Sequence, residues 1–181
     1  MYLKCMKREQ TSDPGPFTSP AKPPQMESST PDRDAVLGHT IQISPIGVVE
    51  IKDPFPRIRI FPPYVDGLVG LDQWSHLVVL WWFHHHDTPE QRRILQVHPL
   101  GNPQHPLTGV FATRAPMRPN LIALTVCRIQ QVEPPFVYVH RIDARDQSPV
   151  LDLKPLVPSD LAPSDVRVPD WMPRQWLHSA E

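Results

Sequence analysis

The sequence predicts a mainly β protein, a small closed or partly open β-barrel with short helical turns. Three observations support this fold class: 25 prolines against 7 glycines in 181 residues, short apolar segments at regular spacing, and no long amphipathic helical pattern. Because proline fixes φ and removes a backbone donor, long helices and continuous central strands must fit between prolines. Short strands joined by Pro-rich turns favour a barrel or a sandwich.

The apolar pattern predicts where the strands lie. A first strand is expected over residues 41–51, bent around Ser44-Pro45 and Gly47, and a cleanly alternating strand over residues 57–61. Residues 64–73 repeat Leu and Gly at short spacing, which indicates a helical turn or a tight corner. The run over residues 76–83 is continuously apolar and is typical of a strand covered on both faces. Further strands are expected at residues 94–97, 109–113, 121–130, 136–140 and 150–153.

Three segments of different composition predict the domain organisation. Residues 1–37 are rich in Pro, Ser, Thr, Gln and charge, so they cannot bury enough apolar surface to offset the entropy of ordering and are expected to be a disordered arm. Residues 38–158 form one domain of ordinary size. Residues 159–181 lose the periodic pattern and form a tail that can dock on the barrel through Val168, Trp171, Met172 and Trp176.

Charge and apolar content exclude several classes of protein. The formal net charge is −1, and residues 38–155 hold 11 Lys and Arg against 10 Asp and Glu, so broad affinity for a nucleic-acid backbone is not expected. Any RNA contact must use a local group of arginines, drawn from Arg57, Arg59, Arg92, Arg93, Arg114 and Arg118. No apolar segment has the length of a signal peptide or a membrane span, which predicts a soluble, cytoplasmic protein without a membrane partner.

Two further absences limit the function. With only two cysteines, Cys5 and Cys127, a disulfide framework is not expected. The closest glycines are Gly67 and Gly70, which do not form a phosphate-binding turn of the dinucleotide or P-loop kind. A Rossmann-type nucleotide or cofactor site is therefore not expected.

A tract of histidines, His84 to His86, follows the buried apolar run and precedes Asp87. Imidazole and carboxylate groups bind zinc or iron, but neighbouring residues of a strand point to opposite faces, so only His84 and His86 could share one metal. No CxxC or HExxH spacing accompanies them. The open readings are contact with a ligand and ordinary histidines at a strand end; no metal site is predicted.

A second stretch, residues 109–120, carries Arg114 and Arg118 in a loop stiffened by proline. Guanidinium groups four residues apart suit a carboxylate or a phosphate, which they can bind with two hydrogen bonds each. The structural alternative is that each arginine pairs with Asp143, Asp146 or Asp152. A third stretch, residues 143–155, is rich in polar groups and by itself indicates only a turn between two strands.

Taken together, these stretches resemble one known family. Ser44-Pro45-Ile46-Gly47, Trp74-Ser75-His76-Leu77, Phe83-His84, Thr113-Arg114-Ala115-Pro116, Arg118-Pro119-Asn120 and Pro149-Val150-Leu151-Asp152-Leu153-Lys154-Pro155 occur in the order and spacing of the TsaA-like, or TrmO-type, family. The resemblance covers residues 43–158. It implies a small, usually dimeric β-barrel that binds S-adenosylmethionine without a Rossmann fold, and its best-known members methylate N6 of threonylcarbamoyladenosine beside the tRNA anticodon.

The resemblance also implies roles for particular residues, and therefore a methyltransferase with S-adenosylmethionine and tRNA as partners. The implied cofactor contacts are His84, His85, Arg114, Val126, Asp146, Gln147 and Ser148. Arg118 and Asn120 are expected to bind the substrate, and either His84 or Asp146 is a candidate proton acceptor, with no choice made between them. A homodimer is expected, for which the local support is a surplus of aromatic residues: Trp81, Trp82, Trp171 and Trp176.

Three departures from the family pattern leave an alternative open. The segment over residues 52–57 is short where relatives carry a Pro-Arg-Gln contact, Gln147 stands where glycine is usual, and Ala123 replaces another glycine. A non-glycine residue at position 147 resists positive φ if the turn needs it. The alternative is a divergent module that binds S-adenosylmethionine or another small ligand, or that methylates a different acceptor.

Overall fold

A computed structural model describes residues 41–158 and 165–173. The chain divides into two units, Met1–Ile41 and Gln42–Glu181, and the barrel belongs to the second. The arm expected over residues 1–37 lies outside the described residues, as do Trp176 and most of the predicted tail.

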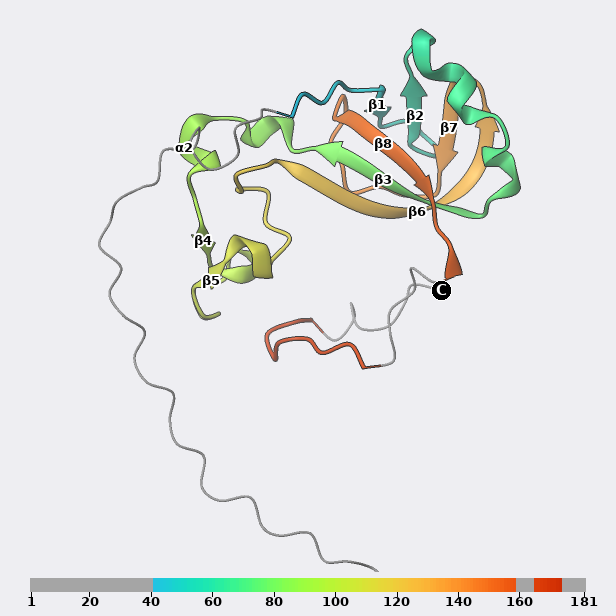
Figure 1. Cartoon of the computed structure of the whole chain (residues 1–181). Coiled ribbons are helices and arrows are strands. Elements are labelled where there is room, and N and C mark those ends of the chain that lie inside the picture. The colour runs from blue at the N-terminus through green and yellow to red at the C-terminus, as the bar shows by residue number, and fades with distance from the viewer. Residues whose placement is uncertain (1–40, 159–164, 174–181) are drawn as a thin grey trace, which may run out of the picture. The chain divides into compact units, whose positions relative to one another are not determined.

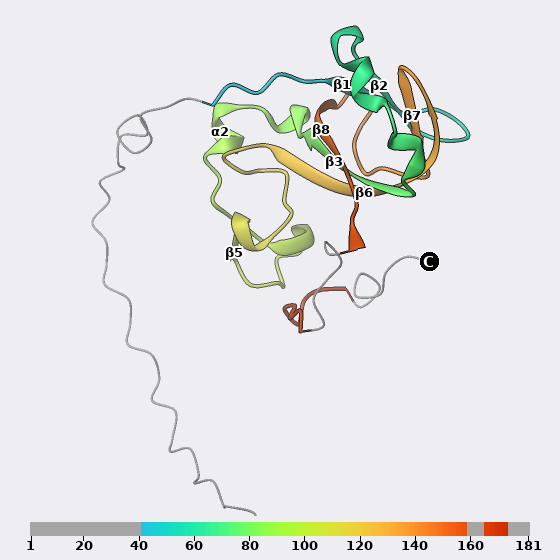
Figure 2. The same cartoon turned by 45° about the vertical axis from the view of Figure 1, so that its right-hand side comes forward.

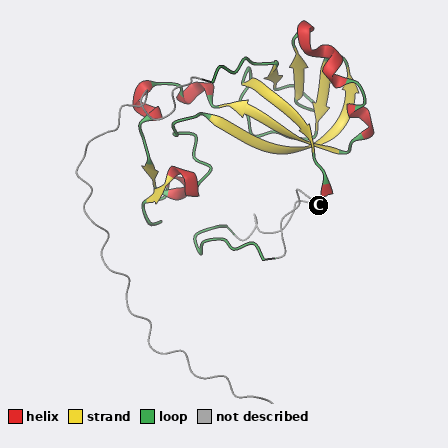
Figure 3. Cartoon of the chain, viewed as in Figure 1, coloured by secondary structure: helices red, strands yellow, loops and turns green. Residues whose placement is uncertain are grey.

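Six antiparallel strands form a closed barrel in the order β1-β2-β7-β6-β3-β8 (Figures 1 and 3). The barrel closes because β1 pairs with β2 on one side and with β8 on the other. The fold class predicted from the sequence is confirmed. The strands are β1 (Gly47–Glu50), β2 (Arg57–Ile60), β3 (His76–Trp82), β6 (Ile122–Glu133), β7 (Phe136–Val139) and β8 (Pro149–Pro155).

Short helical turns connect the strands, as the sequence predicts. Between β2 and β3 the chain forms the 3₁₀ turns η1 (Pro62–Leu68) and η2 (Leu71–Gln73). Between β3 and β6 it leaves the barrel wall, and Figure 2 shows this excursion to one side of the six strands. The excursion contains η3 (His84–His86), α2 (Pro89–Arg92), β4 (Gln96–Val97), η4 (Pro99–Gly101), β5 (Thr108–Gly109) and η5 (Val110–Ala112).

Alternation along β3 builds the barrel core. Leu77, Val79 and Trp81 point inward and are at most 4% exposed, whereas the residues between them are half-buried on the outer face. The expectation of a strand fully covered on both faces is therefore correct only for the inner face. The inner wall is completed by apolar side chains from the other strands, chiefly Val49, Ile58, Ile60, Ala123, Cys127, Val137, Val139 and Val150.

Gly47 marks the true beginning of β1. A side chain there would drive a Cβ into the Arg59 carbonyl oxygen on the neighbouring strand, so only glycine fits. The strand predicted from residue 41 is too long: Ile41 and Ile43 are exposed and outside the sheet. Pro45 explains the difference, because it has no N–H and disfavours regular pairing of the residues before it.

Two other predicted strands differ from the structure. The strand expected over residues 109–113 ends at Gly109, because the backbone N–H and the hydroxyl of Thr113 both donate to the Val110 carbonyl and close a 3₁₀ turn. The strand expected over residues 94–97 is only Gln96–Val97, whereas the strand predicted over residues 121–130 continues to Glu133.

Within residues 41–158 and 165–173, no helix is long and apolar enough to cross a membrane.

Cys127 is a buried free thiol of the core, and burial raises its pKa to about 12. That thiol is therefore protonated and unreactive at neutral pH.

Candidate functional site

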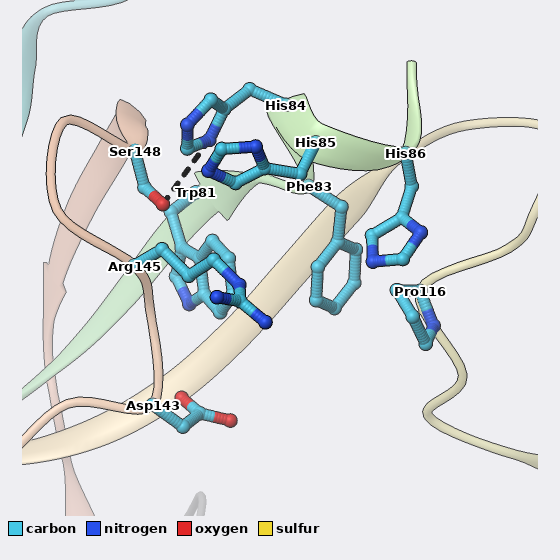
Figure 4. Close-up of a pocket in the computed structure, with 9 residues that line it drawn as sticks. All are labelled: Trp81, Phe83, His84, His85, His86, Pro116, Asp143, Arg145 and Ser148. Atoms are coloured by element: carbon cyan, nitrogen blue, oxygen red, sulfur yellow. Dashed lines mark hydrogen bonds between the residues drawn. The ribbon is translucent and has the colours of Figure 1, made fainter. Parts of the chain in front are cut away.

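The histidine tract and the polar loop before β8 meet at one end of the barrel. Strands β3 and β8 are antiparallel, with Trp81 opposite Val150, so the end of β3 lies beside the beginning of β8. The histidines of η3 follow the first strand, and the loop over residues 141–148 precedes the second. Two segments sixty residues apart in the sequence thus share one barrel end (Figure 4).

A small cavity of about 110 Å³ lies between these two segments. Its floor is aromatic, since Trp81 and Phe83 pack edge to face with ring centroids 4.7 Å apart. Figure 4 shows Ser148 and Arg145 on one side of the cavity and Pro116 on the other. The lining residues are Trp81, Phe83, His84, His85, His86, Pro116, Asp143, Arg145 and Ser148.

His84 is held at the rim of this cavity. Its Nδ1 lies 3.3 Å from the hydroxyl oxygen of the fully buried Ser148, and its ring lies 4.1 Å from the ring of His85. Burial lowers the pKa of His84 below its usual value, with smaller contributions in the same direction from His85 and Arg145. The neutral imidazole is therefore favoured, and it can accept a hydrogen bond or a proton.

His86 presents a polar atom that lacks a partner. Its Nδ1 is buried and makes no hydrogen bond to any described residue, although the ring lines the cavity beside Phe83 at 6.4 Å between centroids. Buried polar atoms are nearly always hydrogen-bonded, so an orphaned one at a cavity calls for a missing partner. A bound ligand or an ordered water molecule would supply it.

The loop before β8 sends one carboxylate away from the cavity. Asp146 accepts a hydrogen bond of 2.8 Å from the backbone N–H of Ile51, just beyond β1. This bond holds the pKa of Asp146 below its usual value. Gln147, which follows, adopts φ of +59° and donates its backbone N–H to the Val49 carbonyl. Neither residue is part of the lining of this small cavity.

Arg118 is used within its own loop. Its guanidinium donates to the carbonyls of Ala115 and Val110, at 3.5 and 3.4 Å. Arg92 donates to the carbonyl of Pro119, the residue after Arg118, at 3.2 Å. The loop is thus tied down on both sides of Arg118, and its shape presents Arg114.

Arg114 lines a second, larger cavity of about 920 Å³. Its guanidinium makes no hydrogen bond or ion pair with the described residues, so its full donor capacity is available to a ligand. The lining also includes Leu100 and Trp171, and the Trp171 ring lies 6.1 Å from the His105 ring. Docking of the tail over residues 159–181 stays a prediction.

The structure brings together only part of the predicted site. His84, His85 and Ser148 line the small cavity, and Arg114 lines the large one. Val126 lies on the outer face of β6, 47% exposed, and Asn120 is exposed after the arginine loop; neither lines a cavity. The assignments of Val126, Asn120, Asp146 and Gln147 as ligand contacts remain predictions from resemblance.

Three of the six arginines considered for RNA contact have acidic partners. Arg57 and Arg59 both bind Glu50 on the outer face of the barrel, at 2.8 and 2.6 Å. Arg92 pairs with Asp87 at 2.7 Å. Of the six candidates, Arg114 and Arg118 share the loop near the cavities.

Several lining residues were not identified from the sequence. His86 and Arg145 belong to stretches that had been singled out, and their position next to His85 and Asp146 was the available signal. Trp81 and Asp143 depend on how the barrel closes, which spacing along the chain does not show. Among the described residues, no group of three or more His, Cys, Asp or Glu side chains could hold a metal ion.

Fold and site together define a small β-barrel protein with a loop-built site, rich in imidazole and guanidinium groups, at one barrel end. Residues 39–160 match the model of the tRNA-methyltransferase O N-terminal domain. Because that match covers most of the chain, the protein belongs to this family, and the family suggested by the sequence motifs is confirmed.

Individual relatives agree with this assignment. A probable S-adenosyl-L-methionine-binding protein of Methanocaldococcus jannaschii is 42% identical over 112 residues, which cover 62% of this chain and 89% of that protein. The human tRNA (adenine(37)-N6)-methyltransferase is 37% identical over 113 residues, but these cover only 25% of its length.

Solved structures show the same fold. The crystal structure of TrmO from Pseudomonas aeruginosa has a TM-score of 0.54 and 32% identity, with 71% of this chain and 62% of that one covered. Another TrmO crystal structure has a TM-score of 0.56 and 34% identity, covering 72% of this chain and 64% of that one. The chain thus spans somewhat less than two thirds of the TrmO chains that it matches.

Proposed function

We propose that this protein transfers a methyl group from S-adenosylmethionine to N6 of threonylcarbamoyladenosine next to the tRNA anticodon. The observation that carries the proposal is the meeting of His84, His85 and Ser148 at one barrel end, beside a loop that presents a free Arg114. Relatives named as S-adenosylmethionine-binding proteins and as tRNA methyltransferases support it. A tRNA substrate also agrees with the cytoplasmic location expected from the sequence.

The residues present fit S-adenosylmethionine. Its carboxylate suits an unpaired guanidinium, offered by Arg114 and Arg145, and its sulfonium suits the aromatic rings of Trp81 and Phe83. The small cavity alone is below the size of a usual ligand site, but the larger one lies within the ordinary range of roughly 300 to 1,000 Å³. The orphaned Nδ1 of His86 agrees with a ligand at this place.

When bound, the cofactor supplies an electrophilic methyl group on a positively charged sulfur. The chain's own contribution is to hold the acceptor in line with that group, since positioning supplies much of the acceleration in such transfers. The acceptor nitrogen is amide-like and weakly nucleophilic, so a group that takes its proton is needed. Of the two proton acceptors considered from the sequence, His84 lines the small cavity, where burial lowers its pKa and favours the neutral imidazole. Asp146 does not face either cavity and remains a prediction in that role.

Two measurements on the same preparation test the proposal. Calorimetric titration with S-adenosylmethionine measures binding, and incubation with labelled cofactor and bulk tRNA measures transfer. We expect both. Binding without transfer would favour the alternative, a module that senses the cofactor or methylates another acceptor; the short residue 52–57 segment between β1 and β2 is the observation that keeps this alternative open. Absence of binding would contradict both.

Arg114→Ala tests the site directly. Charge-assisted hydrogen bonds are typically worth roughly 1.5 to 3 kcal/mol, so we expect about a tenfold to hundredfold loss of ligand affinity. Because Arg114 has no partner among the described side chains, the melting temperature should not change. A stable variant with full affinity would remove this arginine from the site.

We also propose a homodimer that uses the outer face of β3 and β6. Cross-strand pairs line up apolar side chains there, and Ile122, Leu124 and Val126 are 38 to 47% exposed. The paired residues on β3 are Trp82, Leu80 and Val78. Such a stripe is self-complementary when a second copy packs on it around a two-fold axis. Sedimentation should show a dimer that Leu124→Glu converts to a monomer; a monomeric wild-type protein would contradict this.

A further inference from the structure

The two cavities adjoin at one point of the site. Their linings share two residues, Pro116 and Asp143. Pro116 has no side-chain donor or acceptor, so Asp143 supplies the only ionisable group common to both linings. If a donor occupies one cavity and an acceptor the other, the reacting atoms meet where the linings meet.

The Asp143 carboxylate is oriented from inside the barrel. The indole Nε1–H of Trp81 donates to the Thr125 hydroxyl at 3.0 Å, and the Thr125 hydroxyl donates to Asp143 Oδ1. Trp81 is 4% exposed and fixed in the core, so this chain of hydrogen bonds begins on a rigid strand. Within the described residues, Asp143 Oδ2 has no hydrogen-bond donor and is available to a ligand.

Such an arrangement resembles the way in which catalytic carboxylates and imidazoles are usually held. One atom is fixed by a buried partner, and the other faces the reactant at hydrogen-bond distance. Asp146, three residues later, binds the backbone N–H of Ile51 and lies outside both linings.

On this geometry, and resting on the proposed function, we propose that Asp143 is the group that takes the proton from the acceptor nitrogen. The N–H bond breaks and an O–H bond forms on Oδ2, while the nitrogen electron pair forms the new N–CH₃ bond and the carbon–sulfur pair stays on sulfur. The sulfonium becomes a neutral thioether, and the carboxylate becomes a carboxylic acid. Charge and atoms balance without a further reactant.

Several charged and titratable groups lie near Asp143. Arg145 and the histidines of η3 line the small cavity with it, and Arg114 lines the large one. The Cys127 thiol of β6 interacts electrostatically with Asp143 and with Arg141 of the same loop.

Binding measurements test the proposal independently of turnover. The probes are the free nucleoside N6-threonylcarbamoyladenosine and, separately, S-adenosylmethionine. In Asp143→Asn the Oδ1 atom still accepts from Thr125, but an NH₂ group replaces the free oxygen and meets the acceptor N–H donor to donor. We expect at least tenfold weaker nucleoside binding and unchanged cofactor affinity. Loss of cofactor affinity alone would make Asp143 a cofactor ligand and overturn the proposal.

Single-turnover transfer to tRNA is the second readout. Asp143→Asn should lose about 10²- to 10⁴-fold in rate. The matched control is Asp152→Asn on the outer face of β8, where the carboxylate pairs with Lys154 and lines neither cavity. An Asp143→Asn variant with the wild-type rate would overturn the proposal.

Thr125 separates positioning from folding. Thr125→Val removes the donor that orients the Asp143 carboxylate, so the single-turnover rate should fall while the affinity for S-adenosylmethionine stays unchanged. Thr125→Ser keeps the hydroxyl and should retain the wild-type rate, which a merely destabilised barrel would not do. If wild-type protein binds the cofactor but neither binds the nucleoside nor methylates tRNA, the proposed function itself fails and this proposal with it. If wild type is active and Asp143→Asn equally so, only this proposal fails.

Discussion

Arginines at two places in this molecule have opposite surroundings. On the outer face of β2, Arg57 and Arg59 both bind Glu50, and the Arg57 guanidinium also lies 4.1 Å from the centre of the Phe136 ring. At the barrel end, Arg114 and Arg145 line cavities and have no acidic partner among the described residues. Arginine therefore stabilises the outer face of the barrel at β2 and is free to bind a ligand at the barrel end.

The net charge of the chain does not predict whether its candidate site holds unpaired arginines. A protein with a formal charge of −1 can still present free guanidinium groups, provided that its acids are spent elsewhere. Glu50, Asp87 and Asp152 each pair with a basic residue away from the cavities. Changes in the wall should thus affect stability and leave the site intact.

The largest expected effect is a loss of stability when a side chain of the barrel core is truncated. Leu77→Ala removes a fully buried side chain of β3, and such truncations cost roughly 2 to 5 kcal/mol. Urea unfolding should show this loss, while the folded fraction keeps its affinity for S-adenosylmethionine. The matched control is Val69→Ala, at a side chain 89% exposed between η1 and η2. Equal losses for the two variants would mean that the barrel interior is not the core.

A smaller loss of stability is expected when Glu50, the acid that binds Arg57 and Arg59, is neutralised. Burial raises the pKa of Glu50, but the hydrogen bonds and charges of Arg59 and Arg57 outweigh it, so the pKa lies below its usual value. Glu50→Gln should cost roughly 1 to 2 kcal/mol, allowing for screening of the partly exposed arginines. The cost should disappear in acid, because stability from a lowered carboxyl pKa is lost as pH falls. A cost that persists at low pH would contradict the ion-pair origin.

The turn before β8 should gain stability from glycine. Gln147 holds φ at +59°, which costs a residue with a side chain about 1 to 2 kcal/mol, partly offset by the greater entropy of glycine in the unfolded chain. Gln147→Gly should therefore stabilise the protein by roughly 0.5 to 1 kcal/mol in thermal unfolding. Gln147→Ala keeps a Cβ and serves as the control, with little or no gain. Destabilisation by glycine would show that the side chain itself has a structural role.

The smallest expected effect is the contribution of His84 to the pH dependence of stability. Its pKa is lowered in the folded protein, so as pH falls below about 6.5 the unfolded state binds a proton first and the free energy of unfolding declines. His84→Gln should flatten that part of the stability profile relative to wild type, with no difference above pH 7. His98→Gln, outside the small cavity, provides the comparison. A His84→Gln profile identical to wild type would show that this histidine is not perturbed.

Most of the barrel could be predicted because its strands are short apolar segments between Pro-rich turns, with clean alternation in β2 and a continuous apolar run in β3. Where prediction failed, a local backbone interaction overrode the pattern. Pro45 ended the pairing that Ile41 and Ile43 suggested, and Thr113 closed a turn where the sequence alternated like a strand.

The sequence singled out cavity-lining residues only where their chemistry stands out along the chain. His84, His85 and Arg114 stand in conspicuous stretches and line cavities, and their roles as ligand contacts stay predictions. Asp143 did not stand out, because its relation to Trp81 and Thr125 depends on the closure of the barrel. Its neighbour Asp146 has the same side-chain chemistry, and the structure distinguishes the two because Asp146 binds the Ile51 N–H whereas Asp143 lines both cavities.

The pairing that closes the barrel is short and lies next to the site. Strands β1 and β8 share two residue pairs, Gly47 with Val150 and Val48 with Pro149, whereas β3 and β6 share seven. Amides there should exchange with deuterium sooner than those of β3. The Ser148 carbonyl accepts from the Val49 N–H, and the Ser148 hydroxyl lies beside His84. A ligand bound at the histidines should therefore slow deuterium exchange of the β1 and β8 amides. Exchange at this pairing would then report whether the site is occupied, even if the protein does not change shape.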